Sequence, residues 1–322
     1  MYKKICYVST IYSLLLYLLL KSEKDTFFIL GEELPEHFKK SFILPNVFFK
    51  KEIVRGVSKP KKYYLKLKRN IKLKLNLRRV DKNAIVYGYH MSDWVANTLK
   101  EKYRYYILED GLANYNIKEK DIRKKRFNLK EFLFLGARYN YPSYGIDKET
   151  KKIFLTGLEE IPEIIEKKVK IIDLKELWNN KSKDEKDKIL NIFKIKLSDL
   201  EEVEGNNKIL LITQPLSEDK IVDEKEKVEI YKEIIEKHGD ENIVIKKHPR
   251  EKTNYEKIFP KVKILPNEFP LELFSLLDFK IKKVVTLFST SAYSFKGKCE
   301  IDFIGTRGYK KIVEKFGIIE MS

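Results

Sequence analysis

The sequence contains few cysteines and no grouping of residues that is typical of a metal site. Cys6 and Cys299 are its two cysteines among 322 residues, and they lie far apart in the chain. This pattern excludes a disulfide framework, and no Cys/His cluster has the spacing of metal ligands. We therefore expect a cytoplasmic protein without a bound metal or cofactor, in which Cys6 is a buried free thiol.

Apolar runs long enough to cross a membrane are also missing. The apolar run at residues 11–20, IYSLLLYLLL, is followed by the charged residues 21–25, without the small-residue cleavage site of a signal peptide. A membrane-spanning helix needs about 20 apolar residues. We predict instead that residues 11–21 form a buried helix after a first strand, with Ser9 and Thr10 as turn and helix cap.

Several nucleotide-binding and hydrolase motifs are absent. Neither G-x-G-x-x-G nor G-x-x-x-x-G-K-[ST] occurs, which argues against a dinucleotide-binding enzyme or a P-loop NTPase. There is no G-x-S-x-G, and no Asp-x-Asp that would hold a nucleotide sugar through a metal. Nucleic-acid binding is favoured by charge alone, because the sequence has neither a zinc finger nor an RNP-type aromatic strand.

What the sequence does have is a large excess of positive charge. It contains 66 basic and 48 acidic residues, a formal charge of +18, and 43% apolar residues, enough for a packed core. Such a charge favours an anionic partner, which is nucleic acid, an anionic membrane or a phosphorylated substrate. Lysine is spread along the whole chain, which is also typical of a compositional bias of the source.

Residues 59–79 concentrate this charge, with ten basic residues and no acidic one. The apolar residues fit two periods, a helical one at Tyr64, Leu67, Ile71 and Leu75 and an alternating one at Ile71, Leu73, Leu75 and Leu77. A basic amphipathic helix would lie on an anionic membrane surface. The alternative is a solvated surface segment with one apolar edge, and both interpretations remain open.

Short apolar runs alternate with helical patterns, which predicts an α/β protein with parallel sheets. Strands are expected at 4–8, 26–30, 47–54, 84–87, 105–108, 153–155, 169–173, 208–213, 243–245, 262–265 and 283–287. Helices are expected at 94–102, 118–126, 224–237, 271–277 and 309–316. We predict two Rossmann-like domains that face across a cleft, the usual place for a ligand.

The domain boundaries follow from this alternation. We predict an N-terminal acceptor-side domain at residues 1–157 and a connecting segment at 158–207. A nucleotide-donor domain would follow at 208–305, and a helix within 306–322 would pack back on the first domain.

The strand at 243–245 leads into two lysines and then His248-Pro249. Proline cannot continue a sheet ladder, so His248 should lie beyond the carboxyl end of the strand, where open α/β sheets bind ligands. Cationic groups there, Lys247 among them, suit a phosphate. An imidazole among them can protonate a leaving phosphate. The alternative is a histidine that caps its own loop.

Glu109-Asp110-Gly111 follows the apolar strand at 105–108. Adjacent carboxylates repel each other, so we expect one of them to have a raised pKa and to take a proton from an attacking hydroxyl. Gly111 permits a tight turn there. An ordinary Asp-Gly turn is the alternative interpretation.

Further candidates lie in the second half of the chain. Ser289, Thr290 and Ser291 follow the strand at 283–287 and would hold a phosphate, or one of them would cap a helix. Glu272, in the first turn of a helix, would accept hydrogen bonds from ribose hydroxyls, or it is an acid favoured by the helix dipole. Gln214 and Asp219 follow the strand at 208–213 and would face the cleft.

His90 and Asp93 follow the strand at 84–87. His90 would line an acceptor pocket together with Asp93, or it is a hydrogen-bonded structural histidine. Ser92 or Asp93 would also cap the helix at 94–102.

The order Glu109-Asp110-Gly111, His248-Pro249, Ser289-Thr290-Ser291 resembles the acidic, HP and serine/threonine motifs of the bacterial sialyltransferases. The chain is most similar to glycosyltransferase family 52, the lipooligosaccharide sialyltransferases. Supporting stretches are CYVSTIYSLLLYLLL at 6–20, LTGLEEIP at 155–162, ITQPLSED at 212–219 and FPLE at 269–272. Residues 59–79 match no motif of the family.

The resemblance implies a GT-B fold and metal-independent transfer of sialic acid from CMP-sialic acid to a terminal galactose of lipooligosaccharide, with inversion. It also implies a homodimer, and a basic enzyme working on a glycolipid would contact the cytoplasmic face of the inner membrane peripherally. Asp110 is our candidate for the base, with Glu109 as its neighbour and Asp219 as its rival. His248 and Lys247 would neutralise the leaving phosphate.

Two other functions remain open at this point. One is a GT-B glycosyltransferase of surface polysaccharide synthesis that uses another nucleotide donor. The other is a basic protein without enzymatic activity that binds nucleic acid or an anionic membrane. The second alternative predicts that neutralising residues 59–79 abolishes binding, whereas His248→Ala leaves it intact.

Overall fold

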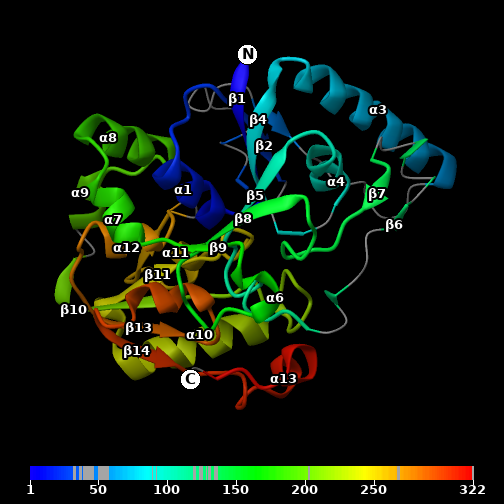
Figure 1. The fold of residues 1–322 in the computed structure, drawn as a ribbon. Helices are drawn as coiled ribbons and strands as arrows, with labels where there is room; N and C mark the ends of the chain where they lie inside the picture. Colours follow the sequence, from blue (N-terminus) through cyan, green and yellow to red (C-terminus); the bar gives the residue numbers. More distant parts are fainter. Residues whose placement is uncertain are drawn as a thin grey trace. The chain divides into compact units, whose positions relative to one another are not determined.

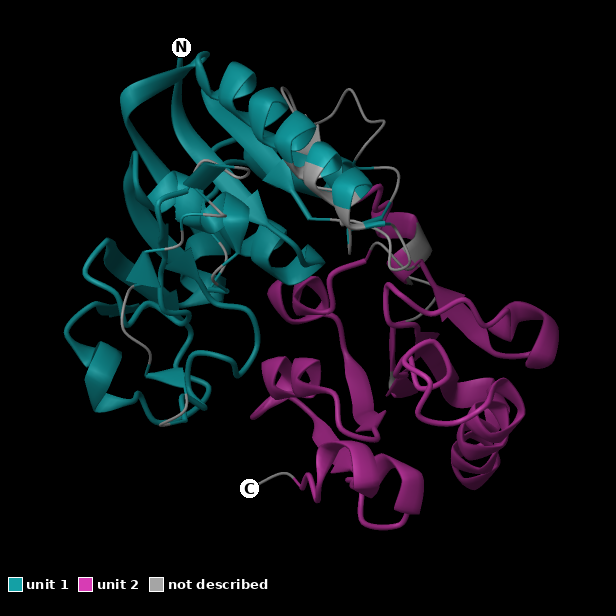
Figure 2. Ribbon diagram, turned by 90° about the vertical axis from the view of Figure 1, so that its right-hand side faces the viewer, with its two compact units in different colours: residues 1–192 teal, residues 193–322 magenta. Residues whose placement is uncertain are grey.

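The computed structural model describes residues 1–31, 34–35, 38, 47–49, 58–88, 90–91, 93–118, 121–122, 126–127, 129, 132–133, 137–201, 204–266 and 269–320. The chain divides into two compact units, Met1–Ile192 and Phe193–Ser322, each with its own parallel sheet (Figure 2). This arrangement confirms the predicted α/β class with two Rossmann-like domains.

The first unit is built on a seven-stranded sheet in the order β3-β2-β1-β4-β5-β8-β9 (Figure 1). Each neighbouring pair of strands is parallel. The strands are β1 (Tyr2–Val8), β2 (Thr26–Leu30), β3 (Val47–Phe49), β4 (Val80–Gly88), β5 (Arg104–Leu108), β8 (Thr150–Leu155) and β9 (Val169–Ile171). All residues of β2 and the last four residues of β1 are buried, as expected of a sheet covered on both faces.

The helices described in the first unit lie between these strands or follow the last of them. They are α1 (Ile11–Leu20), α3 (Lys59–Leu77), α4 (Trp94–Lys100), α6 (Glu163–Glu166), α7 (Leu174–Asn179) and α8 (Lys183–Ile192). Helix α1 is buried along most of its length and is capped by Thr10, as predicted for the apolar run. In the described parts of the chain, no helix combines the length and apolarity that crossing a bilayer requires.

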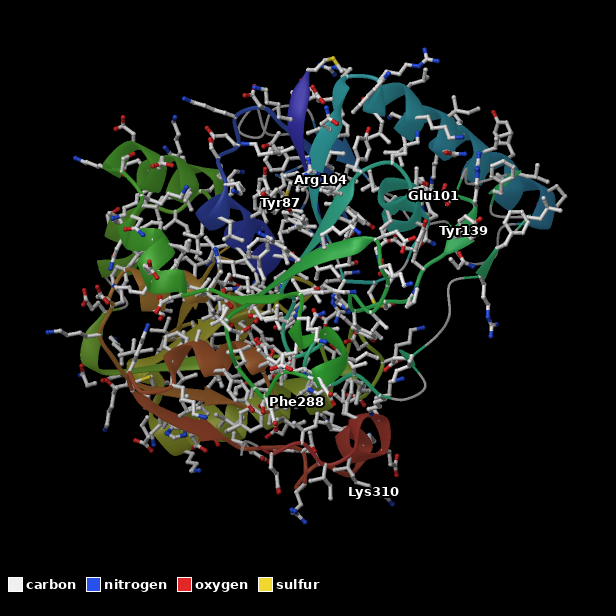
Figure 3. All side chains as sticks on the ribbon, viewed as in Figure 1. Tyr87, Glu101, Arg104, Tyr139, Phe288 and Lys310 are labelled. Atoms are coloured by element: carbon white, nitrogen blue, oxygen red, sulfur yellow. The ribbon has the colours of Figure 1, made fainter. Side chains whose placement is uncertain are left out.

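A small antiparallel ribbon accompanies the first sheet. It pairs β6 (Arg126–Phe127) with β7 (Tyr139–Asn140), so the helix predicted for 118–126 is wrong at its end, and much of the rest of that range lies outside the described residues. Glu101 anchors the ribbon, because its Oε1 accepts from the backbone N–H groups of Arg138 and Tyr139 at 2.5 and 3.0 Å (Figure 3).

The second unit repeats the arrangement with five parallel strands in the order β12-β11-β10-β13-β14. They are β10 (Gly205–Ile212), β11 (Ile243–Lys246), β12 (Lys263–Leu265), β13 (Ile281–Thr286) and β14 (Glu300–Phe303). The helices are α9 (Leu197–Glu201), α10 (Glu224–His238), α11 (Tyr255–Ile258), α12 (Glu272–Leu276) and α13 (Lys310–Phe316), with 3-10 turns η2 (Asp240–Asn242) and η3 (Thr290–Phe295).

Two segments lie elsewhere than the sequence indicated. In the range 158–207, expected to be a connecting segment, β9 pairs with β8 and joins the first sheet. The tail helix α13, expected to pack on the first domain, is anchored in the second unit. Its Ile312 is fully buried in the core of that unit, and Lys311 pairs with Glu226 of α10.

Residues 59–79 adopt the helical alternative as α3. The buried residues Asn70, Leu73 and Leu77 lie on the side that packs against the unit. The opposite side exposes Tyr64, Leu67, Ile71 and Leu75, with exposed fractions of 63, 38, 50 and 49%. The apolar edge predicted from the helical period is therefore exposed, and we refer to these four residues as the α3 stripe.

Candidate active site

Both sheets have a point where the strand order reverses. In the first unit the chain moves outward from β1 to β3 and returns on the other side of β1 as β4, and the second unit repeats this pattern around β10 and β13. In open α/β sheets, ligands bind at the carboxyl ends of the strands at this point. Most of the predicted site residues come directly after strands of the two sheets. In the first unit His90 follows β4 and Asp110 follows β5. In the second unit the strands β10, β11 and β13 are followed by Gln214, His248 and Ser289.

Asp110 lies just beyond β5 and remains partly accessible. Its Oδ1 accepts a hydrogen bond from Thr10 Oγ1 at 2.9 Å, and its Oδ2 lies 3.8 Å from His90 Nδ1, with 16% of the side chain exposed. Gly111 has φ +61°, the left-handed conformation that a glycine adopts without strain. The structure therefore brings two predicted residues, His90 and Asp110, together at the end of the first sheet.

Glu109 is fully buried and is held by several donors. Its carboxylate accepts from the hydroxyls of Tyr12 and Tyr115 at 2.5 and 2.6 Å, and from the N–H and hydroxyl of Thr156 at 2.7 Å each. Burial raises the pKa of Tyr115, and the Glu109 carboxylate adds to this rise, so Tyr115 stays a protonated donor. Glu109 thus ties together α1, the end of β8 and the turn of Asp110, while Asp110 faces other partners.

His90 is a buried side chain, 6% exposed, whose ring stacks on that of Tyr144 with centroids 5.3 Å apart. Burial lowers the pKa of His90 to about 4, so the imidazole is neutral at pH 7. Asp93 caps α4, as predicted, by accepting from the N–H groups of Val95 and Ala96 at 2.9 Å, and it also accepts from the Tyr7 hydroxyl. Its carboxylate therefore serves the fold of the first unit.

His248 follows the end of β11, where Pro249 begins a turn. Its Nδ1 accepts from the backbone N–H of Arg250 at 3.2 Å, which leaves the proton of the neutral ring on Nε2. Burial, assisted by the charges of Arg250 and Lys246, lowers the pKa of His248 to about 4. The histidine does cap its own loop, and in doing so it acquires a defined tautomer that donates from Nε2.

Asp219 and Lys247 both have partners of opposite charge. Arg250 donates two hydrogen bonds to Asp219, one from Nη1 at 2.5 Å and one from Nη2 at 3.0 Å. Both side chains are partly exposed. Lys247 lies 3.5 Å from Glu256. Both oxygens of the Asp219 carboxylate are therefore engaged by the Arg250 guanidinium.

The remaining predicted residues of the second unit also lie at the carboxyl end of its sheet. Gln214 follows β10 and donates its backbone N–H to the Tyr231 hydroxyl at 2.6 Å. The buried Glu272 begins α12 in the first turn, as predicted. Thr290 and Ser291 begin a 3-10 turn rather than an α-helix, and within the described residues Ser289 makes no capping bond with its side chain.

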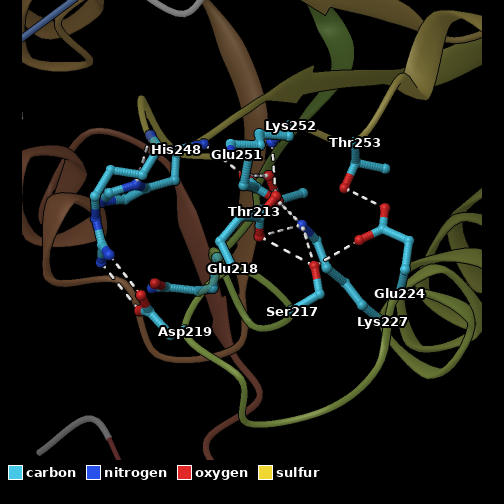
Figure 4. A network of polar contacts seen from close by, with 12 residues as sticks. Thr213, Ser217, Glu218, Asp219, Glu224, Lys227, His248, Glu251, Lys252 and Thr253 are labelled. Atoms are coloured by element: carbon cyan, nitrogen blue, oxygen red, sulfur yellow. Dashed lines mark hydrogen bonds and ion pairs between the residues drawn. The ribbon is translucent and has the colours of Figure 1, made fainter. Parts of the chain in front are cut away.

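Sequence reasoning missed the residues that hold the candidates in place. In the first unit these are Thr10 beside Asp110, and Tyr12, Tyr115 and Thr156 around Glu109. In the second unit, Lys227 and Glu251 form a buried pair, and Glu251 accepts from the backbone N–H of His248 (Figure 4). The sequence did carry a signal for this pair. Lys227 lies one turn before Tyr231 on the buried face of α10, and a buried lysine needs a partner of opposite charge.

In the part of the chain that the structure describes, no group of three or more His, Cys, Asp or Glu residues is placed to hold a metal ion.

Comparison with known folds agrees with this architecture. The chain is similar to the alpha/beta-galactoside alpha-2,3-sialyltransferase of Photobacterium phosphoreum, with a TM-score of 0.56 and 13% identity over 94% of this chain and 90% of that one. It is also similar to the 2,6-sialyltransferase of Photobacterium sp. JT-ISH-224, solved with CMP and lactose, with a TM-score of 0.55 and 13% identity over 91% and 68% of the two chains. The two parallel sheets are therefore of the predicted GT-B type.

Sequence comparison gives a closer relationship. The chain is 40% identical, over 256 residues, to an uncharacterized protein of Haemophilus influenzae, which covers 79% of this chain and 76% of that protein. The family model for glycosyltransferase family 52 matches residues 39–306, which include Asp110, His248 and Ser289. The chain belongs to glycosyltransferase family 52.

Proposed function

We propose that this protein transfers sialic acid from CMP-sialic acid to a terminal galactose of lipooligosaccharide, with inversion and without a metal. The observation that carries the proposal is the neutral His248, which presents an Nε2 donor at the carboxyl end of β11 beside two lysines. Membership of family 52 and the fold shared with sialyltransferases support it.

The reaction moves one sugar and one proton. The acceptor hydroxyl oxygen forms a bond to the anomeric carbon while the bond from that carbon to the phosphate oxygen breaks. The hydroxyl proton passes to a carboxylate of the enzyme, and the electrons of the broken bond leave with CMP. The sugar passes through an oxocarbenium-like transition state. The acceptor attacks the face opposite the leaving group, so the configuration at the anomeric carbon is inverted.

Asp110 is the proposed base. Its carboxylate is partly exposed and receives one hydrogen bond from Thr10, which orients it without neutralising it. The neutral His90 beside it would line the acceptor pocket. Glu109 holds the turn, and Asp93 contributes through the fold of the first unit.

Asp219 is the alternative base. Its partner Arg250 is 42% exposed, so the phosphate of an arriving donor could compete for the guanidinium and release the carboxylate. Asp219 would then become available only when donor is bound.

The donor would be held by the second unit. His248 would donate from Nε2 to the leaving phosphate, and Lys247 would add positive charge. Ser289, Thr290 and Ser291 supply hydroxyl donors at the end of β13, Glu272 would accept from the ribose, and Gln214 would contact the nucleotide.

The proposed location rests on the proposed acceptor and on α3. We propose that the protein works at the cytoplasmic face of the inner membrane, with the α3 stripe and its surrounding lysines in peripheral contact with anionic lipid. We also propose a homodimer, which sedimentation of the purified protein tests directly.

The decisive assay is CMP release and sialyl transfer to a lactose-type acceptor, with and without EDTA. Transfer that survives EDTA, and that is lost in His248→Ala and in either Asp110→Ala or Asp219→Ala, would support the proposal and identify the base. A wild-type protein that neither binds CMP nor transfers sialic acid would overturn it in favour of another nucleotide donor.

A further inference from the structure

The carboxylate of Glu251 lies at the centre of a polar network in the second unit (Figure 4). The side chains of Glu251 and Lys227 are both fully buried, and Oε1 of Glu251 lies 3.1 Å from Nζ of Lys227. We propose that Glu251 is a positioning residue which, paired with Lys227, fixes the backbone of His248 and the loop that carries Asp219. The catalytic consequence of this role rests on the proposed function, whereas the positioning itself does not.

Both oxygens of the Glu251 carboxylate are used. Oε2 accepts from the backbone N–H of His248 at 2.6 Å and from the Thr213 hydroxyl at 2.5 Å. Oε1 accepts from the Tyr255 hydroxyl at 2.9 Å and faces Lys227. These partners belong to the end of β10, the loop after β11, and helices α10 and α11, so one carboxylate joins four segments of the unit.

The position of His248 explains why an acceptor is needed there. The ladder between β10 and β11 ends at Lys246, whose carbonyl accepts from the N–H of Thr213 at 3.1 Å. The N–H of His248 lies past this end, and a shielded N–H group without an acceptor is costly. Glu251 supplies the acceptor and also donates its own N–H to the His248 carbonyl at 2.9 Å. The turn is therefore closed from both sides of His248.

Lys227 makes this arrangement rigid. A buried ammonium is tolerated only with partners, and Lys227 has Glu218 at 2.8 Å in addition to Glu251. Burial raises the pKa of Glu251, and the neighbouring Lys227 charge opposes that rise. Separating Glu251 from Lys227 would leave a fully buried carboxylate without its counter-charge, so α10 and the His248 turn keep one relative position.

A second connection joins the same two loops. The other oxygen of Glu218 accepts from the Lys252 N–H at 2.6 Å, and the next residue, Asp219, pairs with Arg250. The loop after β10 and the turn after β11 are thus linked at two places. The alternative base and the phosphate-binding histidine are held at a set separation by these links.

The test of positioning uses the imidazole of His248 as a probe. The chain has four histidines, so protein with ¹⁵N-labelled histidine gives few signals, and the spectrum of His248→Asn identifies that of His248. We expect the wild type at pH 7.5 to show the tautomer protonated on Nε2. Glu251→Gln replaces one acceptor oxygen by a donor and removes the charge facing Lys227, and we expect a mixture of tautomers.

The matched control is the buried pair Lys100–Asp147 of the first unit, with Nζ and Oδ2 2.6 Å apart. Lys100→Met should lower the melting temperature but leave the His248 signal unchanged. Thr213→Val, which removes one donor to Glu251, provides a milder variant if Glu251→Gln does not fold. Lys227→Met combined with Glu251→Gln removes both charges and should be more stable than Lys227→Met alone.

Kinetics then measure the catalytic consequence. Misplacing a catalytic group such as His248 by about 1 Å costs roughly a hundredfold in rate. The contact of His248 with the leaving phosphate would strengthen as the leaving group departs, so its loss lowers kcat. We expect Glu251→Gln to lower kcat about tenfold to a hundredfold, with a smaller change in the KM for the donor.

Two results would overturn the positioning role. One is a His248 signal in Glu251→Gln, or in its combination with Lys227→Met, that matches the wild type. The other is an equal change of that signal in Lys100→Met, which would indicate a general loss of stability. If the wild-type protein transfers no sialic acid, the proposed function fails, while the tautomer measurement still decides whether Glu251 positions His248.

Discussion

Nδ1 of His90 lies 3.8 Å from Oδ2 of Asp110, although the two residues follow different strands of the first sheet. β4 and β5 are parallel neighbours, so their carboxyl ends bring the residues that follow them to one edge. The neutral imidazole and the partly exposed carboxylate thus meet where a ligand is expected.

Asp110→Asn should remove general-base catalysis and leave the fold intact, because the amide retains an oxygen for Thr10. Loss of a general base costs about 10²–10⁴-fold in rate, and we expect kcat to fall by that amount with the melting temperature almost unchanged. The measurement is sialyl transfer under saturating donor. Full activity of Asp110→Asn, together with an inactive Asp219→Asn, would assign the base to Asp219.

Glu109→Gln, unlike Asp110→Asn, should lower the stability of the protein. The wild-type carboxylate is fully buried and accepts from four donors, and the amide would turn one of its acceptor oxygens into a donor. Hydrogen bonds to charged groups contribute about 1.5–3 kcal/mol each, so we expect a loss of unfolding free energy of about that size or more. Urea unfolding measures it, and a variant as stable as the wild type would contradict the role of Glu109 as an anchor.

Stability should fall as the pH is lowered from about 6.5 to about 4. The pKa of His90 is about 4 in the folded protein, whereas an unfolded histidine has a pKa of about 6.5. Between these values the unfolded chain binds the proton and the folded chain does not, so unfolding is favoured. One histidine contributes about 1.4 kcal/mol per pH unit. The unfolding free energy should therefore depend more steeply on pH in the wild type than in His90→Asn between about pH 6.5 and about pH 4. Equal slopes in the two proteins would contradict a buried, neutral His90.

The α3 stripe should bind anionic vesicles. We expect sedimentation with vesicles that contain phosphatidylglycerol, weakened by salt because lysines supply the attraction, and little binding to phosphatidylcholine alone. Leu67→Ser, Ile71→Ser and Leu75→Ser combined should abolish binding without lowering the melting temperature, since these side chains are exposed.

A matched control for the stripe removes exposed apolar side chains elsewhere. Leu197, Ile258 and Phe316 are exposed by 45, 39 and 43%, and their combined replacement by serine should leave vesicle binding intact. Equal loss in both variants would indicate general hydrophobic adsorption instead of docking by α3.

Several elements could be predicted from local patterns in the chain alone. The apolar run at 11–20 became the buried helix α1, and Thr10 and Asp93 cap their helices as predicted. The His248 turn also follows from a local cause, since Pro249 cannot extend β11. These predictions hold because capping, periodicity and proline geometry act within a few residues.

Other features depend on contacts between parts of the chain that are distant in sequence. The period of residues 59–79 fitted a helix and a strand equally, and packing of Leu73 and Leu77 against the first unit selected the helix. The pair of Lys227 with Glu251 joins α10 to the turn of His248, and no local pattern reports which distant charge a buried lysine will meet. A buried charge is stable only beside its partner, so such contacts arise from the completed fold.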